Sequence, residues 1–383
     1  MKKPAHKTSL PSRWHATGAE LLAAMHRAIV AARETVRLEM YIIQDSPLAQ
    51  HFRAALVAAA HRGVRVRVLA DAWGSSSLSN AFYDPIVKAG GEFRFFNPLT
   101  PWRMGLRDHR KLLVCDEHAA FIGGVNLAPE YDGDGRHDGW RDLGLEVDGA
   151  LAVELAQAFD EMYERADFRH RPYAWLGRST RQRAVTVGPA TLLLSAPGWQ
   201  RNPLIRTLEA DFNAAKKIQI MSAYFLPNLR LRHFLRRAAR RGAQVQLLLA
   251  GKSDVPIMHA ATRGLYRHLL REGVEIYEYQ PQILHAKLIV VDERIVYAGS
   301  ANLDVRSLYL NYELLVRLED PALARQASAL FTADLQHCRH LGHEAWIKSR
   351  HWWERLKSRV AYLLLTELDP FLAAYQTKRL RLP

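Results

Sequence analysis

The sequence predicts an α/β protein built from two similar halves, and three observations support this fold. The segments 109–127 and 285–303 align without a gap and share nine of 19 residues. Helical and strand-like patterns alternate in the same order in both parts of the chain. In addition, 383 residues are too many for one ordinary core and suit two domains. We therefore expect two α/β/α halves packed as a pseudo-twofold dimer, with an active site between them.

Each half is predicted to run helix, strand, helix, strand, strand, motif hairpin and closing helix, on a largely parallel or mixed sheet. These elements are expected at 20–32, 36–43, 54–62, 64–70, 92–96, 109–123 and 151–163, and at 204–215, 218–226, 234–241, 245–250, 274–279, 285–299 and 321–335. Gly63 and Gly242 suit the end of the second helix of each half, because glycine adopts left-handed geometry freely.

Interruptions in the periodicity give the expected domain limits. We expect a flexible N-terminus at 1–17, a first domain at 18–180, a second at 181–345 and a C-terminal tail at 346–383. The boundary between the domains is placed where Arg, Pro, Gly and Thr break the pattern between 168 and 195.

The amino-acid composition limits the classes of partner that the protein is expected to bind. The net charge of +14 and a pI of about 9.9 favour an anionic partner, which could be nucleic acid, a membrane surface or a phosphate-bearing substrate. The two cysteines, Cys115 and Cys338, form no disulfide framework or zinc pattern, which suits a reduced compartment. Neither a signal peptide nor a run of 18 apolar residues occurs in the sequence, so any membrane contact is expected to be peripheral.

The polar positions of the repeat predict a site that handles phosphate. His109 and Lys111 are two residues apart, as are His285 and Lys287, so in an extended strand each pair shares a face. The lysines would neutralise the non-bridging oxygens, while one histidine attacks phosphorus and the other protonates the leaving oxygen. The expected phosphate-binding and supporting residues are Asn126, Asn302, Ser300, Gly124, Asp142 and Glu313.

Carboxylates complete this site. Each histidine needs an acceptor for its second ring nitrogen, and Asp142 and Glu313 occupy equivalent places for this task. Asp116 and Asp292 follow their histidines by seven residues, at the expected turn, where we interpret them as turn or ion-pair supports. No metal or cofactor is expected, because acidic and thiol ligands at suitable spacing are missing and two lysines would oppose a cation.

The two copies of His-x-Lys-(x)4-Asp resemble the signature of the phospholipase D superfamily. Within it, residues 18–335 are most similar to the bacterial cardiolipin synthases, through segments such as LEMYIIQDS, FIGGVNLAPEY, GSANLDVRS and LNYELLV. The resemblance implies phosphatidyl transfer through a phosphohistidine without a metal: one phosphatidylglycerol donates its phosphatidyl group to a second, and glycerol leaves. It also implies a catalytic set in which His109 is the nucleophile and His285 the acid, together with Lys111, Asp116, Lys287 and Asp292.

The chain departs from the longer family members, which begin with two transmembrane helices. It resembles a short, peripheral subgroup in which the second lipid varies, so phosphatidylethanolamine or another alcohol remains a possible acceptor. We expect a monomer at the cytoplasmic side of a bacterial inner membrane, bound to anionic phospholipids such as phosphatidylglycerol and cardiolipin rather than to nucleic acid. The alternatives are a phospholipase D-type hydrolase, a nuclease or other phosphodiesterase, and a non-enzymatic phosphate-binding or scaffolding protein.

The tail supports the membrane interpretation. Residues 346–375 combine three tryptophans with basic residues and an apolar segment, which is typical of a helix lying in the membrane interface. The competing interpretation is an ordinary helix packed on the C-terminal half.

Overall fold

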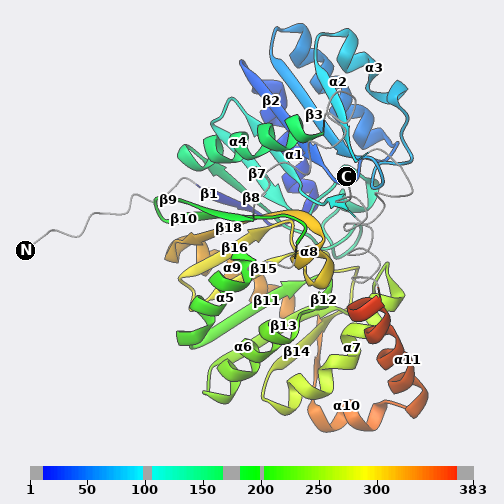
Figure 1. The fold of residues 1–383 in the computed structure, drawn as a ribbon, viewed down its shortest axis with the longest axis vertical. Helices are drawn as coiled ribbons and strands as arrows, with labels where there is room; N and C mark the ends of the chain where they lie inside the picture. The colour runs from blue at the N-terminus through cyan, green and yellow to red at the C-terminus, as the bar shows by residue number, and fades with distance from the viewer. Residues whose placement is uncertain (1–11, 98–105, 167–181, 199–201, 369–383) are drawn as a thin grey trace, which may run out of the picture.

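The computed structural model describes residues 12–97, 106–166, 182–198 and 202–368. Two α/β halves lie one above the other along the long axis of the molecule, with the first half in blue to blue-green and the second in green to red (Figure 1). Both sheets are mixed, and helices cover them. The predicted fold class is therefore confirmed.

The first half contains a seven-stranded sheet. In spatial order its strands are β1 (Ser12–His15), β8 (Gly144–Asp148), β7 (Ala119–Gly123), β6 (Leu112–Cys115), β2 (Thr35–Met40), β3 (Arg65–Asp71) and β4 (Glu92–Phe96). Its helices are α1 (Gly18–Ala31), α2 (Pro47–His61), α3 (Asn80–Lys88) and α4 (Ala150–Arg165), with a short 3-10 turn at Pro129–Tyr131. Strands β2, β3 and β4 are parallel, whereas β6, β7 and β8 form an antiparallel meander.

The second half repeats this plan. Its sheet runs β19 (Cys338–Leu341), β14 (Glu275–Tyr279), β13 (Gln244–Ala250), β11 (Lys217–Ser222), β15 (Leu288–Val291), β16 (Ile295–Gly299), β18 (Asn311–Glu319), β10 (Ala190–Ser195) and β9 (Arg183–Val187). Its helices are α5 (Pro203–Ala214), α6 (Leu229–Arg240), α7 (Pro256–Arg271), α8 (Val305–Tyr309), α9 (Pro321–Leu335), α10 (His343–Ser349) and α11 (Trp352–Leu363), followed by a π-helical turn at Leu364–Leu368. The short strands β12 (Phe225–Leu226) and β17 (Leu303–Asp304) pair with each other.

A shared hydrophobic core joins the two halves. Leu145 and Phe159 of the first half belong to the same buried cluster as Val290 and Phe331 of the second. Helices α4 and α9 lie against this core, and α4 contacts β10 while α9 contacts β1. Because separation would expose this apolar surface to water, each half stabilises the other. This packing also holds the repeated motifs next to one another.

Most predicted elements occur within a few residues of their expected limits, and the helix at 321–335 and the strand at 92–96 match fully. Gly63 and Gly242 follow α2 and α6 with φ of 87° and 89°, as their role at a helix end requires. Helices α3 and α7 were not predicted. In α7, arginines interrupt the apolar pattern along the sequence. The helix is recognisable only from the spacing of the residues that it buries.

Two expected limits differ from the elements that the structure shows. Residues 12–17 are not flexible, because β1 pairs with β8 and the Thr17 side chain caps α1. The tail does not begin at Trp346, since this residue is buried in α10 against Tyr266. The domain boundary expected at 180 and the segment 1–11 lie outside the described residues. No helix in the described part of the chain is long and apolar enough to cross a membrane.

Candidate active site

Each motif begins where the chain crosses into the opposite half. Strand β5 (Arg107–Asp108) leaves the first half and pairs in parallel with β18, and the His109 amide then donates to the Tyr312 carbonyl at 3.0 Å. The reciprocal crossing is a bridge between Arg141 and Leu284, after which the His285 amide donates to the Arg141 carbonyl at 2.8 Å. Backbone pairing therefore fixes both histidines at the seam.

The side chains repeat this exchange. Nδ1 of His109 lies 2.9 Å from Oε1 of Glu313, and Nδ1 of His285 lies 2.7 Å from Oδ2 of Asp142. Both carboxylates are completely buried. A carboxylate can only accept, so Nδ1 carries the proton in each ring and the Nε2 lone pair is directed to the site. Each histidine is thus oriented by a carboxylate from the other half.

The His-x-Lys pairs do not lie within strands, which differs from the expectation. Strands β6 and β15 begin at Leu112 and Leu288, one residue after each lysine. The ammonium groups turn back, so that Nζ of Lys111 donates to the His109 carbonyl at 2.7 Å and Nζ of Lys287 donates to the His285 carbonyl at 2.5 Å. The crossing into the opposite half interrupts the strand, but each ammonium group remains next to the histidine of its own motif.

Burial and mutual repulsion tune the cationic groups. Burial, reinforced by the charges of Lys111 and Lys287, lowers the pKa of both His109 and His285 to about 4, against the opposing effect of Glu313 and Asp142. Burial likewise lowers the pKa of Lys111 to about 7 and of Lys287 to about 8. Each lysine acts electrostatically on the histidine of the other half, so the four groups form one cluster.

The two supporting carboxylates are accommodated differently. Oγ of Ser300 donates to Oε2 of Glu313 at 2.5 Å. A Cβ at Gly124 would lie 2.4 Å from Oδ2 of Asp142, so only glycine leaves room for this carboxylate. Glu313 is therefore held by a hydrogen bond from Ser300, whereas Asp142 occupies space that Gly124 leaves free because glycine has no side chain.

The two asparagines also differ. Oδ1 of Asn126 accepts from the Ile42 amide at 3.1 Å, and the Asn126 side chain also bonds to Tyr131. Asn126 therefore supports the site rather than lining it. Oδ1 of Asn302 is buried and has no partner among the described residues, so this oxygen can accept a hydrogen bond from a ligand hydroxyl.

Asp116 and Asp292 hydrogen-bond to backbone amides rather than to the histidines. The Asp116 carboxylate accepts from the Arg33, Glu34 and Thr35 amides at 2.8–3.0 Å. Asp292 likewise accepts from the backbone amides of Lys216 and Lys217, where β11 begins. Both follow the far end of their strand, roughly 20 Å from the histidine by the rise of extended chain. They support turns, as their spacing indicates.

Aromatic rings around the histidines were not assigned from the sequence. The Tyr41 ring lies 4.8 Å from that of His109 and 4.9 Å from Nζ of Lys111. Tyr131 and Trp140 pack on His285 at 5.1 and 5.5 Å between ring centroids. A tyrosine at the end of the strand at 36–43 was visible in the sequence, but nothing there indicated its contact with His109.

Comparisons with known proteins agree with this geometry. The family model described as cardiolipin synthase, PLD-like domain, matches residues 25–164 and 208–335. The chain is 32% identical over 364 residues to cardiolipin synthase B of Escherichia coli K12, covering 91% of this chain and 86% of the relative. It is 30% identical over 367 residues to cardiolipin synthase 1 of Bacillus anthracis, covering 93% and 71%.

A solved structure extends the agreement to the fold. Phosphatidylserine synthase of Haemophilus influenzae superposes with a TM-score of 0.75 at 16% identity, covering 94% of each chain. At this identity the likeness concerns the fold alone. Taken with the match to the family model over both halves, these relationships show that the chain belongs to the family of phospholipase D-like cardiolipin synthases.

Proposed function

We propose that this protein makes cardiolipin by moving the phosphatidyl group of one phosphatidylglycerol to a second phosphatidylglycerol, or to another phospholipid, with release of glycerol. The observation that carries the proposal is the pair of imidazoles, each held at Nδ1 by a buried carboxylate and flanked by a buried lysine. The curated relatives named cardiolipin synthase support the choice of lipid substrates.

In the first step Nε2 of His109 attacks phosphorus. The new N–P bond forms as the P–O bond to glycerol breaks, and His285 gives its proton to the departing oxygen. Lys111 and Lys287 stabilise the negative charge on the non-bridging oxygens. The products of this step are free glycerol and a phosphatidyl group on His109.

The second step reverses the proton transfer. His285, now neutral, takes the proton from a hydroxyl of the acceptor lipid while the oxygen attacks phosphorus. The N–P bond breaks, and cardiolipin leaves with His109 restored. The same two residues therefore serve both steps, and no net proton is gained or lost.

The assignment of roles to the two histidines has structural support. Nζ of Lys287 lies against the ring of His285, 3.0 Å from Nδ1 and 3.2 Å from Nε2, whereas the described residues contain no such contact between Lys111 and the ring of His109. His109 is therefore the freer nucleophile. His285 starts neutral because its pKa is lowered to about 4, but a bound phosphodiester brings negative charge that raises this pKa.

The setting we propose is the cytoplasmic face of a bacterial inner membrane, to which a monomer binds peripherally. The net charge of +14 supports attraction to anionic phospholipids.

Mass spectrometry of the lipids tests the reaction. Wild type and His109→Ala are incubated in EDTA with phosphatidylglycerol vesicles that contain some phosphatidylethanolamine. Cardiolipin and free glycerol from the wild type alone are expected. Phosphatidic acid as the sole product would mean hydrolysis, and absence of any lipid product together with cleavage of DNA would mean a phosphodiesterase.

A second experiment examines the intermediate. With a phosphatidyl ester of p-nitrophenol, whose leaving group needs no proton, His285→Ala can still complete the first step but lacks the base of the second, so the phosphatidyl group is expected to accumulate on His109 as an acid-labile adduct. An adduct on a residue other than His109 would contradict its assignment as the nucleophile. Turnover at the wild-type rate without any adduct would contradict the role of His285.

A further inference from the structure

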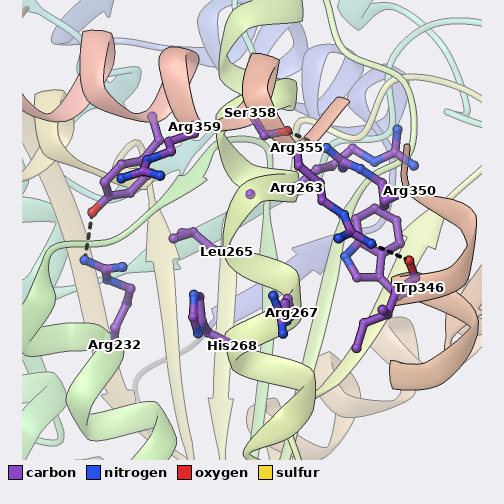
Figure 2. Close-up of a pocket in the computed structure, with 13 residues that line it drawn as sticks. Arg232, Arg263, Leu265, Arg267, His268, Trp346, Arg350, Arg355, Ser358 and Arg359 are labelled. Carbon is purple, nitrogen blue, oxygen red and sulfur yellow. Dashed lines mark hydrogen bonds between the residues drawn. The ribbon is translucent and has the colours of Figure 1, made fainter. Parts of the chain in front are cut away.

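A basic pocket lies between α7 and the C-terminal helices α10 and α11, and it shares no residue with the catalytic site. Its volume is about 450 Å³, which suits a headgroup or other small ligand. Figure 2 shows side chains from α6, α7, α10 and α11 surrounding it. Six arginines contribute to its lining, namely Arg232, Arg263, Arg267, Arg350, Arg355 and Arg359.

The positive charge of this basic pocket is poorly compensated. Two of its arginines have carboxylate partners: Arg263 pairs with Glu278 at 3.2 Å and Arg350 with Glu354 at 3.3 Å. Among the described residues, the other four have no carboxylate partner, and the lining of the pocket includes no acidic residue. Repulsion is visible in the pKa of His268, which burial and the charges of Arg271 and Arg267 lower. An anion in the pocket would relieve this repulsion.

The basic pocket is built on rigid elements. The Trp346 ring is buried between the guanidinium groups of Arg263 and Arg350, whose central carbons lie 5.0 and 5.1 Å from its centroid. Arg232 donates to the hydroxyl of Tyr362 at 2.8 Å, which ties α6 to the helix that closes the pocket (Figure 2). The arginines of α6, α7 and α10–α11 are thus held against one another before any ligand arrives.

Helix α11 carries an exposed apolar surface beside the basic pocket. Trp352 is 72% exposed and Trp353 is 50% exposed. The exposed apolar side chains of the helix and the turn after it are Trp352, Trp353, Leu356, Val360, Leu363 and Leu364. At 3.6 residues per turn they share one side of the helix, while Ser358 and Ala361 pack on the opposite side. Arg355 and Arg359 lie between these two sides, at the mouth of the pocket.

We propose that this basic pocket is a second, non-catalytic site that binds the phosphate-bearing headgroup of an anionic phospholipid in the bilayer, while the apolar surface of α11 enters the membrane interface. Guanidinium groups bind phosphate oxygens through paired hydrogen bonds, and arginine keeps its charge in a partly buried setting. Tryptophan side chains favour the depth of the headgroups. The site does not depend on the catalytic function proposed above.

Continuity of the basic pocket with the apolar surface favours a lipid over a soluble anion. A free phosphate would use the arginines but leave Trp352 and Trp353 in water. A lipid headgroup occupies the pocket while its bilayer covers the exposed ring faces. The exposed apolar residues follow the mouth of the pocket along α11, as a bilayer surface requires.

Vesicle sedimentation tests the proposal with the full chain. All proteins carry His109→Ala to prevent turnover, and they are mixed with phosphatidylcholine vesicles with or without phosphatidylglycerol. The pocket variant is Arg267→Gln with Arg359→Gln. The matched control is Arg206→Gln with Arg237→Gln, which removes the same charge from exposed positions on α5 and α6 outside the pocket.

The pocket variant is expected to lose about 30-fold in affinity for vesicles that contain phosphatidylglycerol, since each basic residue near the surface contributes ~1 kcal/mol. The control variant is expected to bind nearly as wild type does. Equal losses in the two variants would reduce the effect to net charge and overturn the proposal, as would wild-type binding by the pocket variant.

A third variant, Trp352→Gln with Trp353→Gln, examines the apolar surface. It should weaken binding to both kinds of vesicle, whereas the pocket variant should weaken only the binding that depends on phosphatidylglycerol. Inorganic phosphate and single-stranded DNA serve as competitors. The lipid assignment would be overturned if either competitor bound at least as tightly as the vesicles do and lost this binding in the pocket variant. The ligand would then be a soluble anion.

Turnover separates this proposal from the catalytic one. With His109 restored, the pocket variant should convert phosphatidylglycerol in detergent micelles at the wild-type rate. Loss of activity in micelles as well would mean that these arginines serve catalysis, and would overturn a separate docking site. A catalytically silent wild type that still binds vesicles through the pocket would leave the docking site standing and reject the proposed reaction.

Discussion

Nδ1 of His109 lies 2.9 Å from the carboxylate of Glu313, a residue 204 positions later in the chain. The reciprocal pair, His285 and Asp142, is separated by 143 positions and by 2.7 Å between the bonded atoms. Each catalytic imidazole therefore takes its orientation from the half that does not contain it. Neither half holds a complete histidine site, so the proposed activity depends on how the halves pack.

Removing the charge of these carboxylates should impair catalysis strongly. Glu313→Gln and Asp142→Asn keep the shape of the side chain but can present an amide to Nδ1, which favours the wrong tautomer of the ring. We expect kcat to fall by about 10²–10⁴-fold for each variant. Initial rates of cardiolipin formation measure this, with thermal unfolding as the control for folding. Normal rates in both variants would show that the carboxylates do not orient the histidines.

The space that Gly124 leaves for Asp142 should affect the reaction rate as much as the charge of the carboxylates does. In Gly124→Ala the new Cβ meets Oδ2 of Asp142 at 2.4 Å and must displace the carboxylate from His285. A displacement of about 1 Å can cost roughly 100-fold in rate. Ser300→Ala is the matched control in the other half, because it removes one hydrogen bond to Glu313 without displacing it. We expect a much smaller loss there, and equal losses would contradict the steric explanation.

The pH dependence should be bell-shaped. His109 must be neutral to attack, so kcat/KM should rise as pH increases through about 4, the lowered pKa of this histidine. Lys111 and Lys287 must be charged, so kcat/KM should fall as pH passes about 7 to 8. Lys111→Arg keeps its charge and should move the alkaline limb upward towards the pKa of Lys287. Lys216→Arg, at an exposed position, is the control and should leave the alkaline limb unchanged. If Lys111→Arg also left it unchanged, the titration of Lys111 would not set this limb.

The signature aspartates should affect stability more than chemistry. Asp116→Asn retains an acceptor and tolerates the φ of 54° at this position, but it loses the charge that three backbone amides face. We expect the free energy of unfolding to fall by about 1–3 kcal/mol, with little change in kcat of the folded protein. Urea unfolding and initial rates separate the two effects, and Asp292→Asn should behave alike. A large loss of kcat without loss of stability would return these residues to the catalytic set.

Much of the site could be predicted because the motif occurs twice. The repeat identified His109, Lys111, His285 and Lys287, and the equivalent places of Asp142 and Glu313 indicated a shared role. Which carboxylate serves which histidine was not predictable, since the pairing depends on the crossing of β5 to β18. The basic pocket was equally hidden, because its arginines come from three separate parts of the chain.

The sequence by itself determined the two-halved α/β fold, the family and the residue types of the site, because local periodicity and a duplicated motif are both written along the chain. Tertiary structure alone decided the exchange of carboxylates between the halves, the backbone amides that Asp116 and Asp292 face, and the convergence of arginines beside α11. These features depend on contacts between residues far apart in sequence. Such contacts arise from burial of the shared apolar core, which no local pattern specifies.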